Sequence, residues 1–237
     1  DTVAAGKPTE ELARLFRADP LYEGGERAAL RLPTFLGNHD AGRFASFVRR
    51  FQPKASDDEA LKRTMLAHAM LLTLRGVPTI YSGDEQGFVG KGGDQDARQD
   101  MFASKVASYN EERLLGSDRT TAVANFNPDH PLYRQIAALA RIRTGHPALR
   151  RGLQKLRFAG DGPGLFAVSR FDPESGREIL LAFNTSAAPI SANVEVNAAS
   201  RDFTALAGAC PAQPTRPGSI ALRLPPLGYA ICAAVAP

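Results

Sequence analysis

The chain has 237 residues, of which 43% are hydrophobic and 23% charged, and its formal net charge is +4. This composition is ordinary for a globular domain. The basic residues form no stripe interleaved with aromatic residues, so the sequence argues against a nucleic-acid partner. No apolar run is long enough to span a membrane, since the nearest, residues 66–74, is short and contains His68.

The first third of the chain predicts a strand–helix–strand unit. Residues 32–37 read as a buried strand, and a long helix over 60–75 follows a start signal in which Ser56 caps and Glu59 stands three residues later. Gly76 ends that helix, and residues 77–81 form the next strand. Such a unit implies parallel strands joined by a crossover helix. Two shorter helices are expected, over 9–18 with Thr9 as the N-cap and over 44–51.

The rest of the chain divides into two parts of different character. Residues 87–100 form a long polar loop of the kind that often carries function. Helices are expected over 103–115 and 131–143. After Gly152 the pattern changes to short strands with alternating burial, typical of an antiparallel sandwich that forms an autonomous unit and packs on the 131–143 helix. The expected strands cover 153–158, 164–171, 178–183, 192–196, 202–206, 220–224 and 228–235.

Two motifs follow the predicted parallel strands. The apolar run 32–37 stops at Asn38-His39-Asp40, and Arg43 comes three residues later; the second strand runs into the segment 76–87 (GVPTIYSGDEQG). The first motif resembles the strand-seven motif of the α-amylase superfamily, Phe-Leu-x-Asn-His-Asp, and the second resembles its strand-eight segment. The resemblance implies an α/β fold followed by an all-β one. Residues 1–151 would be the last βα units of a (β/α)8 barrel, and residues 152–237 a C-terminal β-sandwich.

The resemblance also implies roles for individual residues. Asp40 would be the third catalytic carboxylate, which holds sugar hydroxyls beside the oxocarbenium-like transition state. His39 would donate a hydrogen bond to the same sugar, and Asn38 would support the geometry. Arg43 would pair with a carboxylate or line the groove, and Arg98 in the following loop would touch sugar. The alternative is a strand-ending turn whose polar groups satisfy backbone N–H groups.

The pair of carboxyls that breaks the bond is not visible. Retaining glycosidases need two carboxyls about 5–5.5 Å apart, and in this family both lie upstream of strand seven. The residues before 32 leave room for only a helix and a loop. We therefore expect part of a retaining α-glucan-active glycoside hydrolase, inactive by itself, whose partners are an α-glucan or oligosaccharide substrate and the missing N-terminal part of the barrel. The alternatives are a non-catalytic carbohydrate-binding or interaction module derived from the family, and an unrelated α/β protein.

No metal or cofactor site is predicted in this chain; calcium would belong to the missing upstream part. Asp94, Asp96 and Asp100 cluster around Arg98, but they lack the glycine and final glutamate of an EF-hand, so a solvated loop is preferred. No two histidines have zinc-ligand spacing. His68 is expected to be packed, whereas His130 and His146 are expected at the surface.

Cys210 and Cys232 are the only cysteines, and two buried thiols are preferred over a disulfide. The high Ala, Arg and Pro content suggests a bacterial-type protein. A secreted or periplasmic location is preferred because polymeric glucan is often external.

Overall fold

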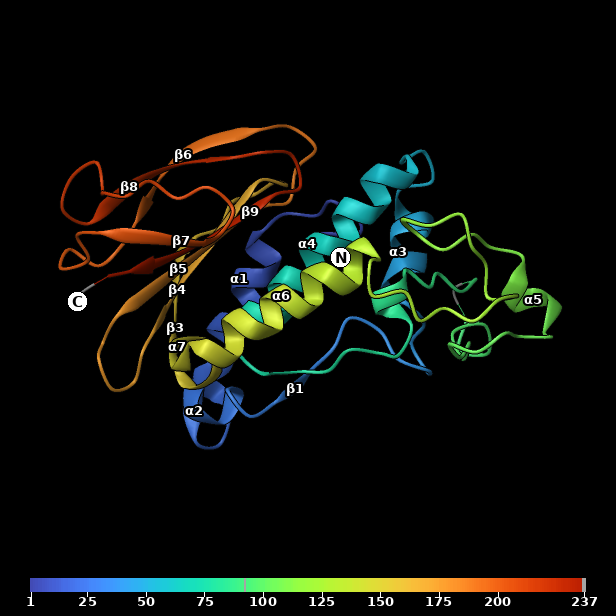
Figure 1. The fold of residues 1–237 in the computed structure, drawn as a ribbon. Helices are drawn as coiled ribbons and strands as arrows, with labels where there is room; N and C mark the ends of the chain where they lie inside the picture. The colour runs from blue at the N-terminus through green and yellow to red at the C-terminus, as the bar shows by residue number, and fades with distance from the viewer. Residues whose placement is uncertain (92, 236–237) are drawn as a thin grey trace.

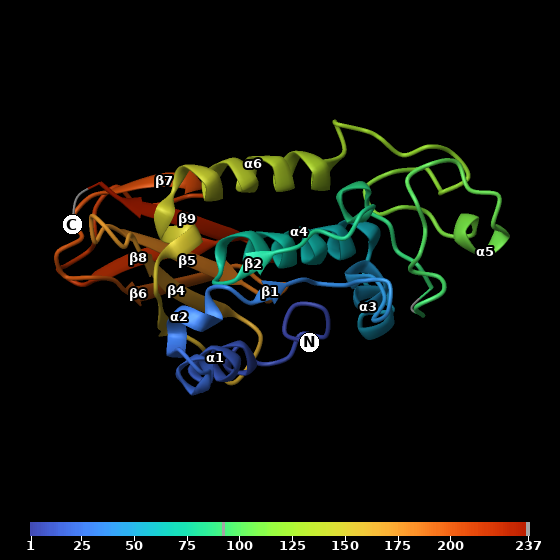
Figure 2. The same ribbon diagram turned by 90° about the horizontal axis from the view of Figure 1, so that it is seen from below.

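The computed structural model describes residues 1–91 and 93–235, and it places helices in the first part of the chain and strands in the last (Figure 1). The segment that carries α5 extends away from the strands in both views (Figures 1 and 2). The helices are α1 (Glu10–Arg17), α2 (Gly25–Ala29), α3 (Phe44–Phe51), α4 (Asp57–Thr73), α5 (Ala107–Asn110), α6 (Pro131–Gly145) and α7 (Pro147–Arg151), with short 3-10 turns at Asp19–Leu21 and Asp84–Gln86. The strands are β1 (Pro33–Thr34), β2 (Val77–Pro78), β3 (Gln154–Phe158), β4 (Leu165–Phe171), β5 (Glu178–Asn184), β6 (Ile190–Glu195), β7 (Phe203–Ala207), β8 (Ser219–Leu224) and β9 (Tyr229–Ala234).

The predicted parallel unit is confirmed. β1 pairs with β2 in parallel, with Pro33 opposite Val77, and the crossover between them contains α3 and α4. Both strands are only two residues long, shorter than predicted, because among the described residues this sheet contains no third strand to continue the ladder. Gly76 enters β2 at a φ of +113°, where an added Cβ would lie 2.6 Å from the Thr34 side chain, so the close approach of the strands requires glycine.

Helix α4 begins and ends with side-chain hydrogen bonds. As predicted, the Ser56 hydroxyl accepts the N–H of Glu59 at 3.1 Å. At the other end, Arg143 on α6 donates to the carbonyls of Leu72 and Gly76, at 3.0 and 2.5 Å. Arg170 on β4, which is fully buried, donates to the carbonyl of Thr73 at 2.9 Å and to that of Gly152. Two guanidinium groups thus satisfy carbonyls at the negative end of the helix dipole.

Three local predictions in the first part fail in whole or in part. Thr9 occupies the N-cap position of α1, as predicted, but its side chain makes no capping hydrogen bond and donates instead to the carbonyl of Leu165 at 3.0 Å. Only Ala107–Asn110 is helical within 103–115, because the N–H of Ser104 bonds to Thr121 and that of Leu115 to Gly87. His130 is buried rather than at the surface, and its ring bonds to the N–H of Leu132 and the carbonyl of Leu115.

The strands after Gly152 form the predicted antiparallel sandwich, with ends that differ from prediction by at most two residues. One sheet has the order β3-β4-β5-β9-β7 and the other pairs β6 with β8. Alternate residues of the larger sheet, including Leu165, Ala167 and Leu180, meet Ile220 and Leu222 of the smaller one in a shared core. This period of two is the one predicted from the sequence.

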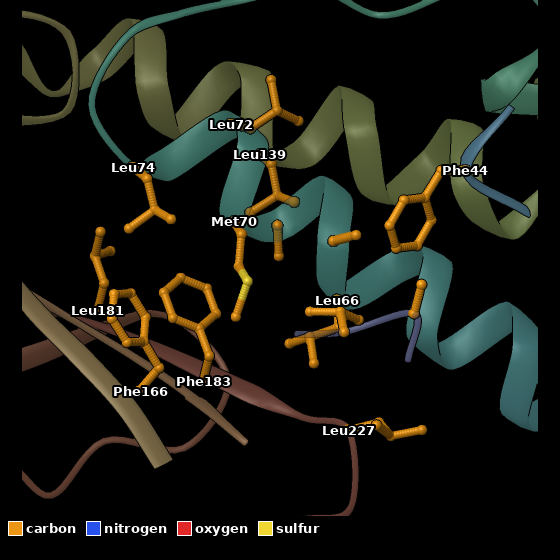
Figure 3. Close-up of a cluster of buried hydrophobic side chains, with 14 of the residues drawn as sticks. Phe44, Leu66, Met70, Leu72, Leu74, Leu139, Phe166, Leu181, Phe183 and Leu227 are labelled. Carbon is orange, nitrogen blue, oxygen red and sulfur yellow. The ribbon is translucent and has the colours of Figure 1, made fainter. Parts of the chain in front are cut away.

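The opposite face of the larger sheet is also buried, so the alternation along its strands does not leave one face in solvent. Phe166, Leu181 and Phe183 pack with Met70 on α4 and Leu139 on α6 in a second hydrophobic cluster (Figure 3). The expected packing on the 131–143 helix is confirmed. Both faces of the larger sheet are buried because helices cover the side that solvent would otherwise reach.

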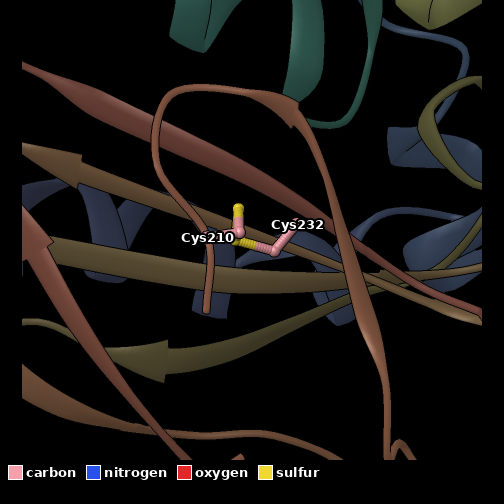
Figure 4. The surroundings of a disulfide bond; sticks show 2 residues. All are labelled: Cys210 and Cys232. Carbon is pink, nitrogen blue, oxygen red and sulfur yellow. A yellow bond between two sulfur atoms is a disulfide. The ribbon is translucent and has the colours of Figure 1, made fainter. Parts of the chain in front are cut away.

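Cys210 and Cys232 form a disulfide with a Cα–Cα distance of 5.7 Å, so the preference for two thiols was wrong (Figure 4). The pairing of β7 with β9 places Cys232 opposite Ala205, and the chain leaving β7 brings Cys210 back to the same place. That proximity depends on strand register, which a separation of 22 residues does not reveal.

Within the described residues no helix is both long enough and apolar enough to cross a membrane.

Candidate functional site

Two turns meet at one end of the parallel strand pair. β1 leads into the turn at 38–42, and β2 leads into the turn at 82–87. Because the strands are parallel, their carboxyl ends lie at the same edge of the sheet, which is where α/β folds assemble their sites.

The Asn38–Gly42 turn is held by its own side chain and backbone. Asn38 and Gly42 exchange two backbone hydrogen bonds, of 3.1 and 3.0 Å. The Asn38 carboxamide oxygen accepts the N–H groups of Asp40 and Ala41, at 2.9 and 2.7 Å. Gly37 must be glycine, since a Cβ there would lie 2.4 Å from the carbonyl oxygen of Gly42. Asn38 therefore shapes the turn that presents the next two residues.

His39 and Asp40 project from this turn into solvent, with side chains that are 59% and 71% exposed. The His39 Nε2 lies 3.4 Å from one Asp40 oxygen, and the Arg98 guanidinium lies 3.8 Å from the other. Arg98 also contacts Asp94 at 3.4 Å. The structure thus brings together four of the five residues singled out in the sequence, Asn38, His39, Asp40 and Arg98, although Arg98 is 58 positions beyond Asp40.

Arg43 lies behind this surface and is fully buried. Its guanidinium donates to the Asp84 carboxylate at 2.9 Å and to the Gln99 side chain at 2.8 Å. It also lies 4.4 Å from the centre of the Tyr81 ring. Of the two roles predicted for Arg43, the structure contains the pairing with a carboxylate, and its side chain has no surface to offer a groove. The pairing joins the turn after β1, the turn after β2 and the loop that carries Arg98.

Asp84 and Gln99 were missed by sequence reasoning. Burial raises the pKa of Asp84 to about 6, although Arg43 opposes that shift and Glu85 adds to it.

His68 on α4 also faces Asp84, with its Nε2 3.9 Å from the second carboxylate oxygen. Burial lowers the pKa of His68, whose Nδ1 bonds to the carbonyl of Thr64. His68 is thus packed, as predicted. In the sequence, Asp84 is marked only by its position just after a predicted strand. Glu85 has the same position, so this pattern does not distinguish the two carboxylates.

Two residues shape the turn after β2. Gly83 has a φ of +97°, which the tight turn requires. Glu85 accepts the N–H of Gly83 at 2.9 Å and so satisfies loop backbone. The acidic loop shows no metal geometry: within residues 1–91 and 93–235 no group of three or more His, Cys, Asp or Glu side chains could hold a metal ion. Gly92, which falls inside the predicted loop 87–100, lies outside the described residues.

Residues 25–152 match the sequence family described as "Alpha amylase, catalytic domain". This chain belongs to the α-amylase family of glycoside hydrolases. The match covers both turns of the site together with the helices between them and after them. It is consistent with the resemblance carried by the Asn38–Asp40 motif and the 76–87 segment.

Individual relatives agree with the family. The chain is 45% identical to an alpha-amylase of Streptomyces lividans over 203 residues, which are 86% of this chain and 22% of that protein. It is 30% identical to a cyclomaltodextrin glucanotransferase of Paenibacillus macerans over 159 residues, which are 67% of this chain and 17% of that protein. The chain thus spans about a fifth of the length of these curated relatives.

The fold is that of the family's solved structures. All of this chain superposes on 45% of an Anoxybacillus alpha-amylase, with a TM-score of 0.73 at 21% identity. At that identity the similarity is evidence for the fold alone. The shared fold is the end of a barrel with its helices, followed by an antiparallel β domain.

Proposed function

We propose that this chain is part of a retaining α-glucan-active glycoside hydrolase and that Asp40 is its transition-state-stabilising carboxylate. The supporting observation is the Asn38–Gly42 turn, which holds Asp40 exposed at the carboxyl end of β1 beside His39 and Arg98. A carboxylate fixed at such a point can hydrogen-bond sugar hydroxyls and oppose the positive charge that develops on the sugar ring.

Each neighbouring residue has a role in this proposal. His39 donates to the same sugar, Asn38 fixes the turn through its two backbone hydrogen bonds, and Arg98 contacts sugar and balances the charge of Asp40. Arg43 acts one layer below, where its pair with Asp84 holds the turns together. We propose an indirect, positioning role for Arg43 in place of the groove contact.

The nucleophile and the proton donor are proposed to lie in an upstream part of the barrel, as they do in the family. Among the described residues, the ionisable side chains within 4 Å of Asp40 are His39 and Arg98, neither of which carries a carboxyl that could act as nucleophile or proton donor. We therefore propose that the 237 residues alone do not hydrolyse α-glucans and that the missing part of the barrel is their partner. We place the boundary between barrel and sandwich near Arg151, and any calcium in the upstream part.

Export from the cell is a further part of the proposal. It is supported by the Cys210–Cys232 disulfide, since such bonds persist in oxidising compartments. The hydrolase hypothesis and the hypothesis of a non-catalytic binding module make different predictions for Asp40. Only the first requires Asp40 for turnover in a complete barrel.

The decisive experiment compares Asp40→Asn with His39→Asn in a chain that also carries the upstream barrel. Asn keeps the size of Asp but loses the charge and puts an amide donor where acceptors are needed, so we expect kcat on maltooligosaccharides to fall by several orders of magnitude. His39→Asn removes one hydrogen bond and no fixed negative charge, so its loss should be smaller. Thermal unfolding of each variant provides the control for folding. Near-full activity of Asp40→Asn with an unchanged melting curve would contradict the assignment, and turnover by the 237-residue chain itself would contradict the proposed division of labour.

A further inference from the structure

A cavity rich in arginine lies where the helical part of the chain meets the sandwich. Its volume is about 560 Å³, which is within the range of small-molecule sites. Arg27 on α2 and Arg31 just after that helix line one side of it, and Arg150 and Arg151 on α7 line another. Figure 1 shows α2 beside α7, next to the strands of the sandwich. The fold thus gathers four guanidinium groups from segments that are far apart in the sequence.

Three of these guanidinium groups have no partner of opposite charge. Within residues 1–91 and 93–235, no carboxylate lies within 4 Å of Arg27, Arg31 or Arg150, and no side-chain hydrogen bond holds them. Arg151 differs, since it pairs with Glu174 at 3.0 Å. Most of the positive charge at the cavity is therefore available to a ligand.

The acidic groups around the cavity do not neutralise it. Asp172 lines the cavity, but its Oδ1 accepts the N–H groups of Glu174 and Ser175, at 3.0 and 2.9 Å, and is committed to its own turn. Glu26 on α2 lines the neighbouring cavity instead. When Asp172 and Glu174 are set against the four arginines, a net charge of +2 remains. The concave shape favours a small anion over the surface of an acidic protein.

Buried arginines behind the cavity add to its positive potential. Burial, and then the charge of Arg150, lowers the pKa of Arg143. Burial, and then the charges of Arg143 and Arg75, lowers the pKa of Arg170. Charges that lower one another's pKa are close enough for their fields to add, and a concave wall of low dielectric focuses such a field. An anion in the cavity is thus attracted by more than the four arginines that line it.

We propose that this cavity binds a phosphate ester, with the phosphate held by Arg27, Arg31 and Arg150 and an apolar or aromatic body lying against Leu153 and Phe171. The planar guanidinium group donates two parallel hydrogen bonds to phosphate oxygens. A phosphate dianion matches the net charge of +2, whereas a carboxylate supplies a single negative charge. Leu153 is 42% exposed and forms, with Phe171, an apolar part of the wall.

This cavity is separate from the candidate active site. Arg31 lies two residues before β1, so the cavity is at the amino end of that strand, whereas the Asn38–Gly42 turn follows its carboxyl end. In barrel enzymes the chemistry takes place at the carboxyl ends of the strands. The proposal therefore concerns a binding site, and it does not depend on any role for Asp40.

The test is isothermal titration calorimetry of the purified 237-residue chain with phenyl phosphate, inorganic phosphate and benzoate, at about pH 8, where phosphate is dianionic. Phenyl phosphate should bind best. Inorganic phosphate lacks the apolar body and benzoate lacks the second charge, so both should bind more weakly.

A pair of double variants locates the binding. Arg27→Gln/Arg150→Gln should bind phenyl phosphate about tenfold more weakly, equivalent to about 1.4 kcal/mol. Arg216→Gln/Arg223→Gln is the matched control, because it removes the same charge from two exposed arginines of the sandwich that do not line this cavity. Circular dichroism melting shows whether each variant is folded.

Several outcomes overturn the proposal. One is a wild-type chain that does not bind phenyl phosphate, and another is an equal loss of binding in the two double variants, which indicates attraction to the net charge alone. Inorganic phosphate that binds as tightly as phenyl phosphate contradicts a site for an ester. Loss of binding in a chain that also carries the upstream barrel means that barrel residues fill the cavity. Each of these results leaves the Asp40→Asn kinetics to decide the catalytic proposal.

Discussion

The buried pair of Arg43 and Asp84 joins three separate segments of the candidate site, although neither side chain reaches solvent. Each partner of such a buried ion pair compensates the charge of the other. Removal of one partner is costly because it leaves the other as an unpaired charge that water reaches poorly. Gln99 accepts from the same guanidinium, so removal of Arg43 would also take away the group that orders Gln99.

We predict that Asp84→Ala lowers the free energy of unfolding by about 3–5 kcal/mol. Urea denaturation followed by circular dichroism measures the change. Asp118→Ala is the control, since Asp118 pairs with Arg113 at the surface, where such pairs contribute about 0–1 kcal/mol. Equal losses in the two variants would show that the buried pair is not special.

The pH dependence of stability follows from the raised pKa of Asp84. Its ordinary value is 3.8 and burial raises it to about 6, so between these values the folded chain keeps a proton that the unfolded chain has lost. The contribution of Asp84 to stability is therefore greatest below pH 3.8 and is lost as the pH rises to about 6. Asp84→Asn does not titrate, so the difference in unfolding free energy between wild type and Asp84→Asn should shrink from pH 4 to 6 and then level off. A difference that grows with pH would mean that Arg43 outweighs burial and lowers the pKa.

Sequence reasoning found the surface residues of the site and the buried Arg43, but not the partners of Arg43. Asn38, His39 and Asp40 are contiguous and follow an apolar strand, so their place at a strand end could be predicted. Asp84 and Gln99 contact Arg43 across 41 and 56 positions, and those contacts depend on how the loops after β1 and β2 fold back. A local pattern cannot specify such long-range pairs.

Among the structural elements, the disulfide links the chain after β7 to the strand β9. In the loop-closure model a cross-link across 22 residues stabilises the folded state by about 3 kcal/mol, because it restricts the unfolded chain. We predict a loss of that order when Cys210 and Cys232 are reduced, measured by urea denaturation with and without dithiothreitol. The double variant Cys210→Ala/Cys232→Ala should show the same lowered stability and no response to the reductant. A wild-type chain that is equally stable in both conditions would contradict the prediction.

Elements with strong local signals were predicted well, and elements shaped by distant contacts were not. The strands of the sandwich follow from period-two alternation and turn residues, and α4 follows from Ser56 and Glu59. The region 103–115 contains residues that favour helix, yet its N–H groups bond to Thr121 and Gly87 instead. There, tertiary pairing overrides propensity.

At the scale of the whole molecule, the larger sheet of the sandwich belongs to two cores at once. One face packs on the smaller sheet and the other packs on α4 and α6. The helical part and the sandwich are therefore mutually stabilising, although the chemistry proposed here lies only in the first.

This shared face predicts the behaviour of residues 152–237 when they are produced alone. The strands should form, since β4, β5 and β9 pair within the segment. The face with Phe166, Leu181 and Phe183 would be uncovered, so we expect the segment to self-associate, as large exposed apolar faces do. Size-exclusion chromatography with light scattering measures this, and Leu181→Lys should restore a monomer. A monomeric wild-type segment would show that the helices contribute little to its solubility.

The contact of Arg170 with the end of α4 has a consequence for how the chain is made. Residues emerge from the ribosome in order, so α4 is complete nearly a hundred residues before the side chain that binds the carbonyl of Thr73 exists. Until then the last turn of α4 lacks that partner, and the face of α4 that Phe166 and Phe183 cover stays open. With a ribosome paused before residue 165, we expect this end of α4 to be incompletely covered, so the part that carries the candidate site is completed only when the strands of the sandwich have been synthesised.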